Sequence, residues 1–460
     1  MLFRSGAYHQ LLGPAIPTLS VLMMPGLYRT KNIRAEIIGA FTNCTPTDAY
    51  RGAGRPEATH GIERMVDILA DELKMDPAEI RFKNFVHNEE FPFPTATGLT
   101  YDSGNYAAPL EKAMALGEYS KLLAEQAEAR KQGKLMGIGL CTYGEICGFG
   151  PSPATPAGGW ECGTVRVEPS GKVTVLTGSC HHGQGEETTF AQLAADELGC
   201  DIDDILVLRG DTAIVPYGIG TFGSRATAIG GTALYFALQD LKTKMKKFGG
   251  VLLDSDDVSY ADGRAVCNKT GKSVTFKEIA AASYRAMKLP PNTEPGLVST
   301  HFWEPPNFTF GFGAHLCVTE IEPDTGQVKV RRYLAVDDCG NFLNPLLVDG
   351  QVHGGVAQGM GQALWEQGVY DDNGQLVTGE YTDYAMPRAH MMPWIESEHT
   401  ITPSPVNPLG VKGVGEAGTI GASPSVVNSV VDALSHLGVR HIDMPLTPEK
   451  IWKLVAGGKN

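Results

Sequence analysis

Apolar residues recur at helical spacing in segment 57–75, EATHGIERMVDILADELKM. This spacing predicts an amphipathic helix with one buried face. Asp76 and Pro77 follow directly, and they are typical of the N-cap and first position of a second helix. A more polar helix is predicted over 118–132. The residues expected on the buried face of the first helix are Ile62, Met65, Val66, Leu69 and Leu73.

The pattern changes near residue 133, after which stretches of β-branched and other apolar residues alternate with glycine-rich turns. Segment 135–150 is predicted to be a strand, and segments 163–179 and 314–340 are predicted to be hairpins. Strand, glycine loop and helix recur without a fixed period. This arrangement predicts an α+β fold, with layered mixed sheets and helices, rather than a solenoid.

Composition narrows the class of protein. The chain has 460 residues, of which 42% are hydrophobic and 20% charged, as in an ordinary globular protein of two or three domains. Its formal net charge of -14 argues against nucleic acid as a partner, because phosphate binding needs clustered cations. The apolar run 19–28 is interrupted by Pro25 and is too short to span a membrane.

Cysteine usage adds two expectations. The nine cysteines are scattered, and no pair has the C-x-x-C spacing of an iron–sulfur or zinc site. An odd number of cysteines without a signal peptide is typical of reduced thiols in the cytoplasm.

Residues 413–418, GVGEAG, match the G-x-G-x-x-G pattern of dinucleotide-binding folds. Three prolines between 403 and 408 argue against the central strand that this pattern requires. The following helix is expected to start late, with Ser423 as N-cap and Pro424 at its first position. A nicotinamide-dependent dehydrogenase therefore stays only as an alternative.

Glu416, between these glycines, suggests a different role. Small neighbours let a bulky ligand come close, and apolar surroundings raise the pKa of a carboxylate until it can act as a base. The alternative for a single Glu is an ordinary surface turn.

Three further glycine-rich segments carry polar side chains, and each is expected at the mouth of a helix. Gln amides offer paired donors and acceptors that match the edge of a fused heterocycle such as a pterin. Hydroxyl groups and free backbone N–H groups suit a phosphate. Each turn alone is more often structural. The side chains concerned are Gln184, Ser224, Arg225, Thr227, Gln351 and Gln358.

In this order, the motifs resemble the large subunit of the molybdenum hydroxylases, the family of xanthine dehydrogenase, aldehyde oxidoreductase and aerobic carbon monoxide dehydrogenase-type enzymes. The resemblance runs from about residue 45 to the C-terminus. The segments that carry it are DAYRGAGRPEATHGIERMVDILADEL, GSCHHGQGEETTFAQLAADELG, GTFGSRATAIGG, DDCGNFLNPLLVDGQVHGGVAQGMGQAL and GVKGVGEAGTIGASPSVVNSVVDAL.

The resemblance implies roles for individual residues. Glu416 would be the base in a hydroxylation that uses water as the oxygen source, and Arg51 would lie over the metal. Gly52, Ala53 and Gly54 would form the substrate-facing loop. The cofactor-binding residues would be Gly183, Gln184, Gly185, Gly223, Ser224, Arg225, Ala226, Thr227, Gln351, Gln358, Lys412, Gly413 and Gly415.

The resemblance also implies a cofactor and partners. The cofactor would be molybdopterin cytosine dinucleotide, and its dithiolene would hold the molybdenum, so no metal ligand is expected from the protein. Iron–sulfur clusters and FAD are expected only on partner subunits, a small and a medium one. Residues 1–132 would be part of a first molybdopterin-binding domain, and residues 133–460 a second one with two α+β subdomains.

Two departures from the family pattern matter. The carbon monoxide-oxidising members have a Cys where this chain has Gly52, which argues against that activity. The resemblance implies an aldehyde or an N-heterocycle as the small-molecule substrate. The family's large subunit is longer, and a separate N-terminal half is a possible partner. The alternative is a non-catalytic half-subunit or assembly module. The sequence specifies neither the individual substrate nor the oligomeric state.

Overall fold

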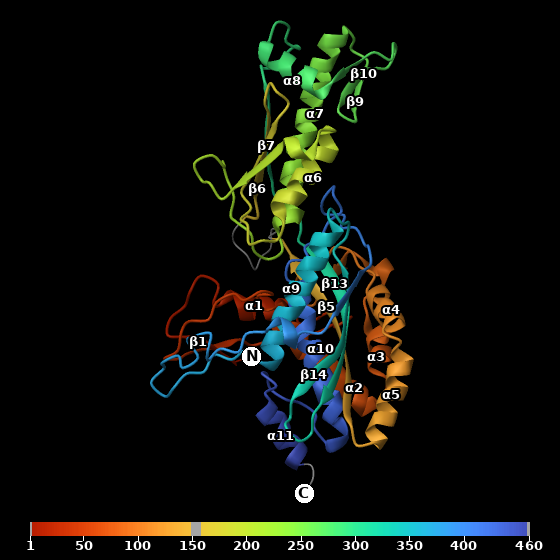
Figure 1. The fold of residues 1–460 in the computed structure, drawn as a ribbon, viewed down its shortest axis with the longest axis vertical. Coiled ribbons are helices and arrows are strands. Elements are labelled where there is room, and N and C mark those ends of the chain that lie inside the picture. Colours follow the sequence, from red (N-terminus) through yellow and green to blue (C-terminus); the bar gives the residue numbers. More distant parts are fainter. Residues whose placement is uncertain (1, 149–157, 458–460) are drawn as a thin grey trace.

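The computed structural model describes residues 2–148 and 158–457 (Figure 1). One four-stranded sheet has the order β15 (Ile395–His399), β14 (Val328–Asp338), β13 (Thr309–Ile321) and β5 (Leu135–Cys147). β13 is antiparallel to β5 and β14, which confirms the predicted strand and hairpin in this part of the chain. Residues 149 and 150 of the expected strand lie outside the described residues.

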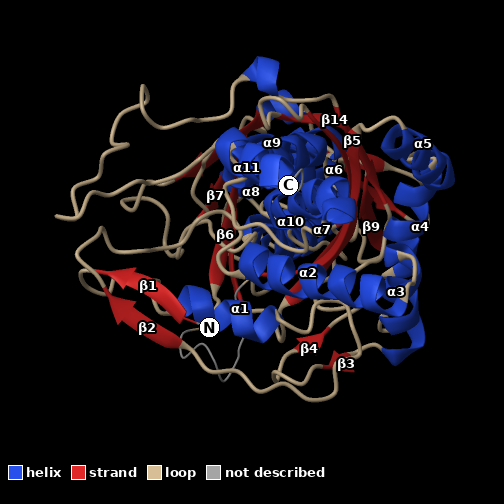
Figure 2. Ribbon diagram, turned by 90° about the horizontal axis from the view of Figure 1, so that it is seen from below, coloured by secondary structure: helices blue, strands red, loops and turns tan. Residues whose placement is uncertain are grey.

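The two faces of this sheet are covered by different helices, as Figure 2 shows for β5 and β14. Ile138 of β5 packs in a cluster with α4 (Ala107–Leu116) and α5 (Tyr119–Lys131). Tyr333 of β14 packs in a second cluster on the opposite face. Alternate residues along a strand point to opposite faces, so every residue of β5 is buried. The helices of the second cluster are α9 (Pro345–Leu364), α10 (Ala417–Leu434) and α11 (Pro448–Gly457).

Glycines let α10 lie directly on β5. A Cβ added to Gly137 would lie 1.8 Å from the Ser429 carbonyl oxygen, and one added to Gly139 would lie 2.1 Å from that of Ser425. Any side chain at these positions would force the helix away from the sheet. Several of the chain's glycines therefore serve packing between elements, not turns that face a ligand.

A second four-stranded sheet lies at the other end of the molecule, the upper part of Figure 1. Its order is β12 (Leu297–Trp303), β6 (Glu161–Val167), β7 (Val173–Thr177) and β8 (Ile205–Arg209). β6 and β7 form the hairpin predicted over 163–179. Its core includes Phe190 of α6 and Leu238 of α7. The other elements of this end are α6 (Glu186–Leu198), α7 (Thr232–Leu253), β9 (Val258–Ala261), β10 (Arg264–Cys267), β11 (Ser273–Thr275) and α8 (Phe276–Arg285).

The first predicted helix is α2 (Arg55–Leu73), and its expected buried face is confirmed only in part, because Ile62 and Val66 pack against the core whereas the other three residues do not. Met65, Leu69 and Leu73 are half exposed, at 59%, 48% and 56%. Glu63 is buried instead, and it pairs with Arg81 of α3 (Pro77–Asn84). The inner face of α2 therefore combines apolar side chains with a buried ion pair, which apolar spacing does not indicate.

The N-terminal part of the chain also contains α3 and several shorter elements. The Asp76 carboxylate accepts hydrogen bonds from the N–H groups of Ala78 and Glu79, which confirms Asp76 as the N-cap of α3. Within the described residues, no helix is both long enough and apolar enough to cross a membrane. The other elements are β1 (Leu2–Gly6), α1 (Ala15–Met23), β2 (Ile38–Phe41), β3 (Phe93–Pro94) and β4 (Thr100–Tyr101).

Two predicted helix starts are wrong. α10 begins at Ala417, directly after Glu416, and Pro424 lies inside it. Packing against β5, β13 and α9 on nearly all sides stabilises this helix through its proline. α9 begins at Pro345, with the Asn344 side chain accepting from Leu347 N as its N-cap, so it starts well before the glycines.

The α+β fold class is confirmed by these two helix-covered sheets. The boundary expected between residues 132 and 133 falls between α5 and β5, and it stays a prediction.

Candidate active site

Glu416 lies where three distant segments meet. Its Oε1 accepts a hydrogen bond from the Gly52 N–H at 2.9 Å. Its Oε2 accepts from Arg55 Nη2 at 2.7 Å and from Ser224 Oγ at 3.0 Å. The side chain is 13% exposed. These are polar donors, so the expectation of apolar surroundings for this carboxylate is wrong, although its expected place among glycines holds.

The predicted substrate loop has an unusual backbone. Gly52, Ala53 and Gly54 have φ values of 109°, 45° and 91°, all in the left-handed region. A Cβ at Gly52 would lie 2.4 Å from Pro56 Cγ, so glycine is required there. This turn directs the Gly52 N–H at Glu416 and starts α2, which places Arg55 in the first helical turn.

Arg51 connects this loop to α9 and to the segment before α10. Its Nε donates to the Gly415 carbonyl oxygen at 2.6 Å, and its Nη2 donates to Gln351 Oε1 at 3.1 Å. Nη1 lies 3.5 Å from Gln358 Oε1. Burial lowers the pKa of Arg51, and the charge of Glu416 opposes this shift. Three residues predicted for the site are thereby brought into contact around one guanidinium.

Gln351 and Gln358 do not lie in a turn at the mouth of a helix. Both are inside α9, because this helix starts at Pro345. The adjacent Gly355 and Gly359 serve a different purpose from ligand approach. A Cβ at Gly355 would lie 2.9 Å from Gly418 Cα, so these glycines let α9 pack closely on α10.

Ser224 joins two carboxyl groups. It has φ of 52°, and its Oγ contacts Glu145 Oε1 as well as Glu416 Oε2. A Cβ at Gly413 would lie 2.4 Å from Ser224 Cβ, so only glycine fits at this contact. The glycine pattern around Glu416 therefore reflects close approach of the Ser224 loop.

Arg55 and Glu145 were not predicted as site residues. Arg55 is buried, and it also donates to the carbonyl oxygens of Gly52 and Ile146. The sequence feature that could have identified Arg55 is a cation in the first turn of a helix, where the helix dipole disfavours positive charge. The signal for Glu145 was a single acidic residue within an otherwise apolar strand, because buried carboxyls commonly have a specific role.

The Gln184 loop lies against the loop that leads to Ser224. Thr221 Oγ1 accepts from Cys180 N and donates to Glu186 Oε1, each at 2.9 Å. Gln184 donates to the Cys180 carbonyl oxygen, so its side chain stabilises its own turn. Burial raises the pKa of Glu186 to about 7, and its Oε2 is buried without a partner in the described part of the chain.

These two loops fit a pterin and a phosphate in chemical terms. Among the described residues, a Cβ at Gly183 would meet nothing within 4 Å, and one at Gly223 would meet only the Gly148 carbonyl oxygen, at 3.6 Å. The space beside the Cα atoms of both glycines is therefore open, although the Gly223 carbonyl oxygen accepts a hydrogen bond from the Gly148 N–H at 2.7 Å. The unpartnered Glu186 Oε2 leaves one buried acceptor available. Backbone N–H groups with neutral amides and hydroxyls bind phosphates and heterocycle edges.

Arg225 and Lys412 are engaged inside the protein. Arg225 is buried and pairs with Glu161 at 2.7 Å. Lys412 Nζ lies 3.3 Å from the Ser103 carbonyl oxygen and over the ring of Phe312. Burial lowers the pKa of Lys412. Ala226 and Thr227 lie in the first turn of a π-helix (Ala226–Gly231) that leads into α7.

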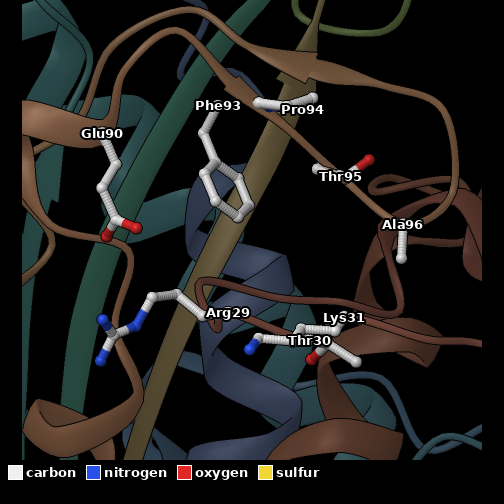
Figure 3. A pocket seen from close by; sticks show the side chains of 8 residues that line it. All are labelled: Arg29, Thr30, Lys31, Glu90, Phe93, Pro94, Thr95 and Ala96. Atoms are coloured by element: carbon white, nitrogen blue, oxygen red, sulfur yellow. The ribbon is translucent and has the colours of Figure 1, made fainter.

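Two cavities lie apart from this cluster. One, of about 380 Å³, is lined by Arg29, Lys31 and Glu90 among others (Figure 3). A larger one, of about 1400 Å³, includes Arg331 and Trp394 in its lining. Neither contains a residue that touches Glu416. Among the described residues, no group of three or more His, Cys, Asp or Glu could hold a metal ion.

Comparison with known families gives two matches. Residues 112–393 match a family model described as a molybdopterin cofactor-binding domain, and residues 1–85 match a second model of the same description. The chain is 41% identical over 439 residues to the carbon monoxide dehydrogenase large chain of Hydrogenophaga pseudoflava, which covers 93% of this chain and 54% of the relative. It is 36% identical over 463 residues to the nicotine 6-hydroxylase large subunit of Paenarthrobacter nicotinovorans, covering 98% and 56%.

Comparison with solved structures gives matches of the same kind. A crystal structure of a Cu,Mo-CO dehydrogenase matches with a TM-score of 0.92 at 36% identity, covering 100% of this chain and 59% of that chain. Quinoline 2-oxidoreductase from Pseudomonas putida 86 matches with a TM-score of 0.93 at 35% identity, covering 99% and 59%. The chain thus spans a little over half the length of the curated relatives it matches.

Proposed function

The chain belongs to the large-subunit family of the molybdenum hydroxylases, and from this premise we propose that it contributes the catalytic base to a hydroxylase of an aldehyde or an N-heterocycle. The observation that carries the proposal is the convergence of Gly52, Arg55 and Ser224 on the Glu416 carboxylate. Names among the relatives and neighbours, nicotine 6-hydroxylase and quinoline 2-oxidoreductase, support an N-heterocyclic substrate. Gly52 provides no thiol beside Glu416, which argues against oxidation of carbon monoxide.

The residues of the two open loops would hold the cofactor, which we propose is molybdopterin cytosine dinucleotide. When bound, it supplies the redox chemistry that oxidises the substrate carbon, with oxygen from water. Gly183, Gln184, Gly185 and Gly223 would contact it through peptide and amide groups. Gln351, Gln358 and Gly415 would lie at its other side, because Arg51 holds them together.

The chain's own residues fix the geometry of the base. Arg55 and Ser224 both bind Oε2 of Glu416, whereas Oε1 has a single donor in the described part of the chain, the Gly52 N–H. Oε1 therefore keeps a free lone pair. We propose that this lone pair accepts the proton of the water-derived oxygen that attacks the substrate carbon. A positioned carboxylate of this kind contributes typically ~10²–10⁴-fold to the rate. Arg51 would stabilise negative charge that develops nearby.

Electron transfer would require other chains. We propose an iron–sulfur subunit and an FAD subunit as partners, and a cytoplasmic location. A polypeptide that supplies the remaining length of the relatives is a further proposed partner, because this chain covers only 54–56% of them. The same coverage motivates the second candidate function, a non-catalytic half-subunit that serves assembly.

A dinucleotide-binding role for residues 413–418 has less support. α10 does start at Ala417, closer than expected, but no strand precedes Gly413 in the described region between residues 400 and 412. The Glu416 side chain also binds Arg55 where a pyrophosphate would have to lie.

The test is Glu416→Gln in the chain assembled with its partner subunits. We expect unchanged molybdenum content and a loss of turnover of about 100-fold or more, because the amide retains the shape but not the basicity. Turnover close to that of the wild type, with full molybdenum content, would exclude Glu416 as the base. Stoichiometric molybdenum in the assembled wild type without turnover on any aldehyde or N-heterocycle would favour the assembly module.

A further inference from the structure

A single hydroxyl group lies between two carboxyl groups at this site. Ser224 Oγ contacts Oε1 of Glu145 and Oε2 of Glu416. A serine hydroxyl has one hydrogen and can donate to only one acceptor at a time. If both carboxyls were ionised, Ser224 could donate to one of them, and its contact with the other would place a lone pair of Oγ against a lone pair of the carboxylate oxygen. The geometry is satisfied when one of the two carboxyls carries a proton and donates it to Ser224.

The partners of each carboxyl decide which one holds this proton. Glu416 receives Arg55 on Oε2 and the Gly52 N–H on Oε1, and both donors favour the ionised form. Glu145 is buried, at 0% exposed, and its Oε2 has no hydrogen-bond partner in the described residues. An ionised carboxylate with an unpaired buried oxygen is strongly disfavoured. The proton therefore belongs on Glu145.

The electrostatic surroundings agree with this assignment. Burial raises the pKa of Glu145 to about 7, the nearby charge of Arg55 lowers it, and the charge of Glu416 raises it. Burial also keeps the thiol of Cys147 neutral by raising its pKa. The charged and titratable groups around Glu145 are Arg51, Arg55, Tyr143, Cys147, Cys339 and Glu416.

We propose that Glu145 is a protonated carboxylic acid that donates to Ser224 Oγ, and that Ser224 in turn donates to Glu416, so that Glu145 positions the catalytic base. The role for the base rests on the proposed function, whereas the protonated state does not. If Glu145 is neutral, the positive charge of Arg55 pairs with the Glu416 carboxylate and not with two carboxylates. It also fixes the direction of the Ser224 O–H, so that the free lone pair of Glu416 stays on Oε1.

The protonated state is tested by infrared spectroscopy on the assembled complex that contains the full chain. We expect the wild type minus Glu145→Gln difference spectrum to contain a carboxylic acid C=O band below pH about 7, the pKa of Glu145, and to lose it above that pH. The matched control is Glu449→Gln, since Lys453 lowers the pKa of this exposed carboxylate and no acid band should change. A difference spectrum without the acid band would overturn the proposal.

The positioning role is tested by comparing two substitutions in the same complex. The amide of Glu145→Gln can still donate to Ser224, whereas Glu145→Ala cannot. We expect kcat of Glu145→Ala to be about tenfold below that of Glu145→Gln, the effect of one hydrogen bond, with KM similar in both. Equal kcat values in the two variants would overturn this role.

The two sets of results separate this inference from the proposed function. An acid band that disappears in Glu145→Gln, together with normal turnover in Glu416→Gln, would reject Glu416 as the base but keep the protonated Glu145. An absent band together with an inactive Glu416→Gln would reject only the inference.

Discussion

Arg55 Nη2 lies 2.7 Å from Glu416 Oε2, and this ion pair joins the first turn of α2 to the residue that precedes α10. The two residues are 361 positions apart in the chain. Arg55 is 2% exposed and Glu416 13%, so the pair is largely removed from water. Removing one member of such a pair leaves an uncompensated charge.

The first prediction concerns this pair. Arg55→Met should destabilise the folded chain by about 3–5 kcal/mol, as expected when one partner of a buried pair is lost. In a Glu416→Gln background the same substitution should cost less, because no carboxylate is left unpaired. Chemical unfolding of the wild type, both single variants and the double variant measures this coupling. Additive effects would show that the pair is not energetically linked.

The second prediction concerns the contact between Gly413 and Ser224. Gly413→Ala places a Cβ 2.4 Å from Ser224 Cβ, so the Ser224 loop must move. Since this loop carries the hydroxyl that binds Glu416, we expect kcat to fall by about tenfold or more. Gly350→Ala is the matched control, because a Cβ there meets nothing within 4 Å. Comparable losses in both variants would contradict a specific steric effect.

The third prediction concerns the packing of α10 on β5. Gly139→Ala should lower the free energy of unfolding by about 1–3 kcal/mol or more, because its Cβ would lie 2.1 Å from the Ser425 carbonyl oxygen. Gly350→Ala, in an exposed part of α9, should instead be neutral or stabilise the chain by up to ~1 kcal/mol through helix propensity. Thermal unfolding of both variants checks the difference in sign.

Hydrophobic periodicity predicted where many of the elements lie, but it did not fully predict which faces they bury. The strands and hairpins around β5, β13 and β14 were predicted because alternation and turns are local signals. The buried face of α2 was predicted only in part, because the Glu63–Arg81 pair is a tertiary contact that apolar spacing does not indicate. Likewise, Pro424 indicated a helix start, whereas the helix continues through it because α10 packs against β5, β13 and α9.

The residues of the candidate site likewise fall into those that the sequence predicted and those that it did not. Glu416, Arg51 and Ser224 were predicted from motifs that lie on single segments. Ser224 does bind Glu416, and Arg51 binds the carbonyl oxygen of the preceding Gly415. Arg55 and Glu145 become recognisable only through partners far along the chain. Lys412 was predicted beside Gly413, yet its side chain extends to Ser103, because one position along an extended segment reverses the direction of a side chain.

The last prediction follows from the pKa of Glu145, which burial raises to about 7 from its ordinary value of 4.5. The folded state then binds this proton more tightly than the unfolded state does. The resulting contribution to stability is complete below pH about 4.5 and is lost as the pH rises through about 7. Glu145→Gln has no such proton, so its unfolding free energy should decline less across this pH range than that of the wild type.

Melting temperatures of the wild type and Glu145→Gln, measured at a series of pH values, check this expectation. Glu186 and Asp67, with pKa values raised to about 7 and about 6, are present in both proteins, so their contributions cancel in the difference. The difference in melting temperature should therefore move in favour of Glu145→Gln between pH about 4.5 and about 7 and level off above that range, because Glu145 is then ionised in the folded wild type. Parallel curves would mean that Glu145 titrates alike in the folded and unfolded chains. A protonated Glu145 that donates to Ser224 would then be excluded.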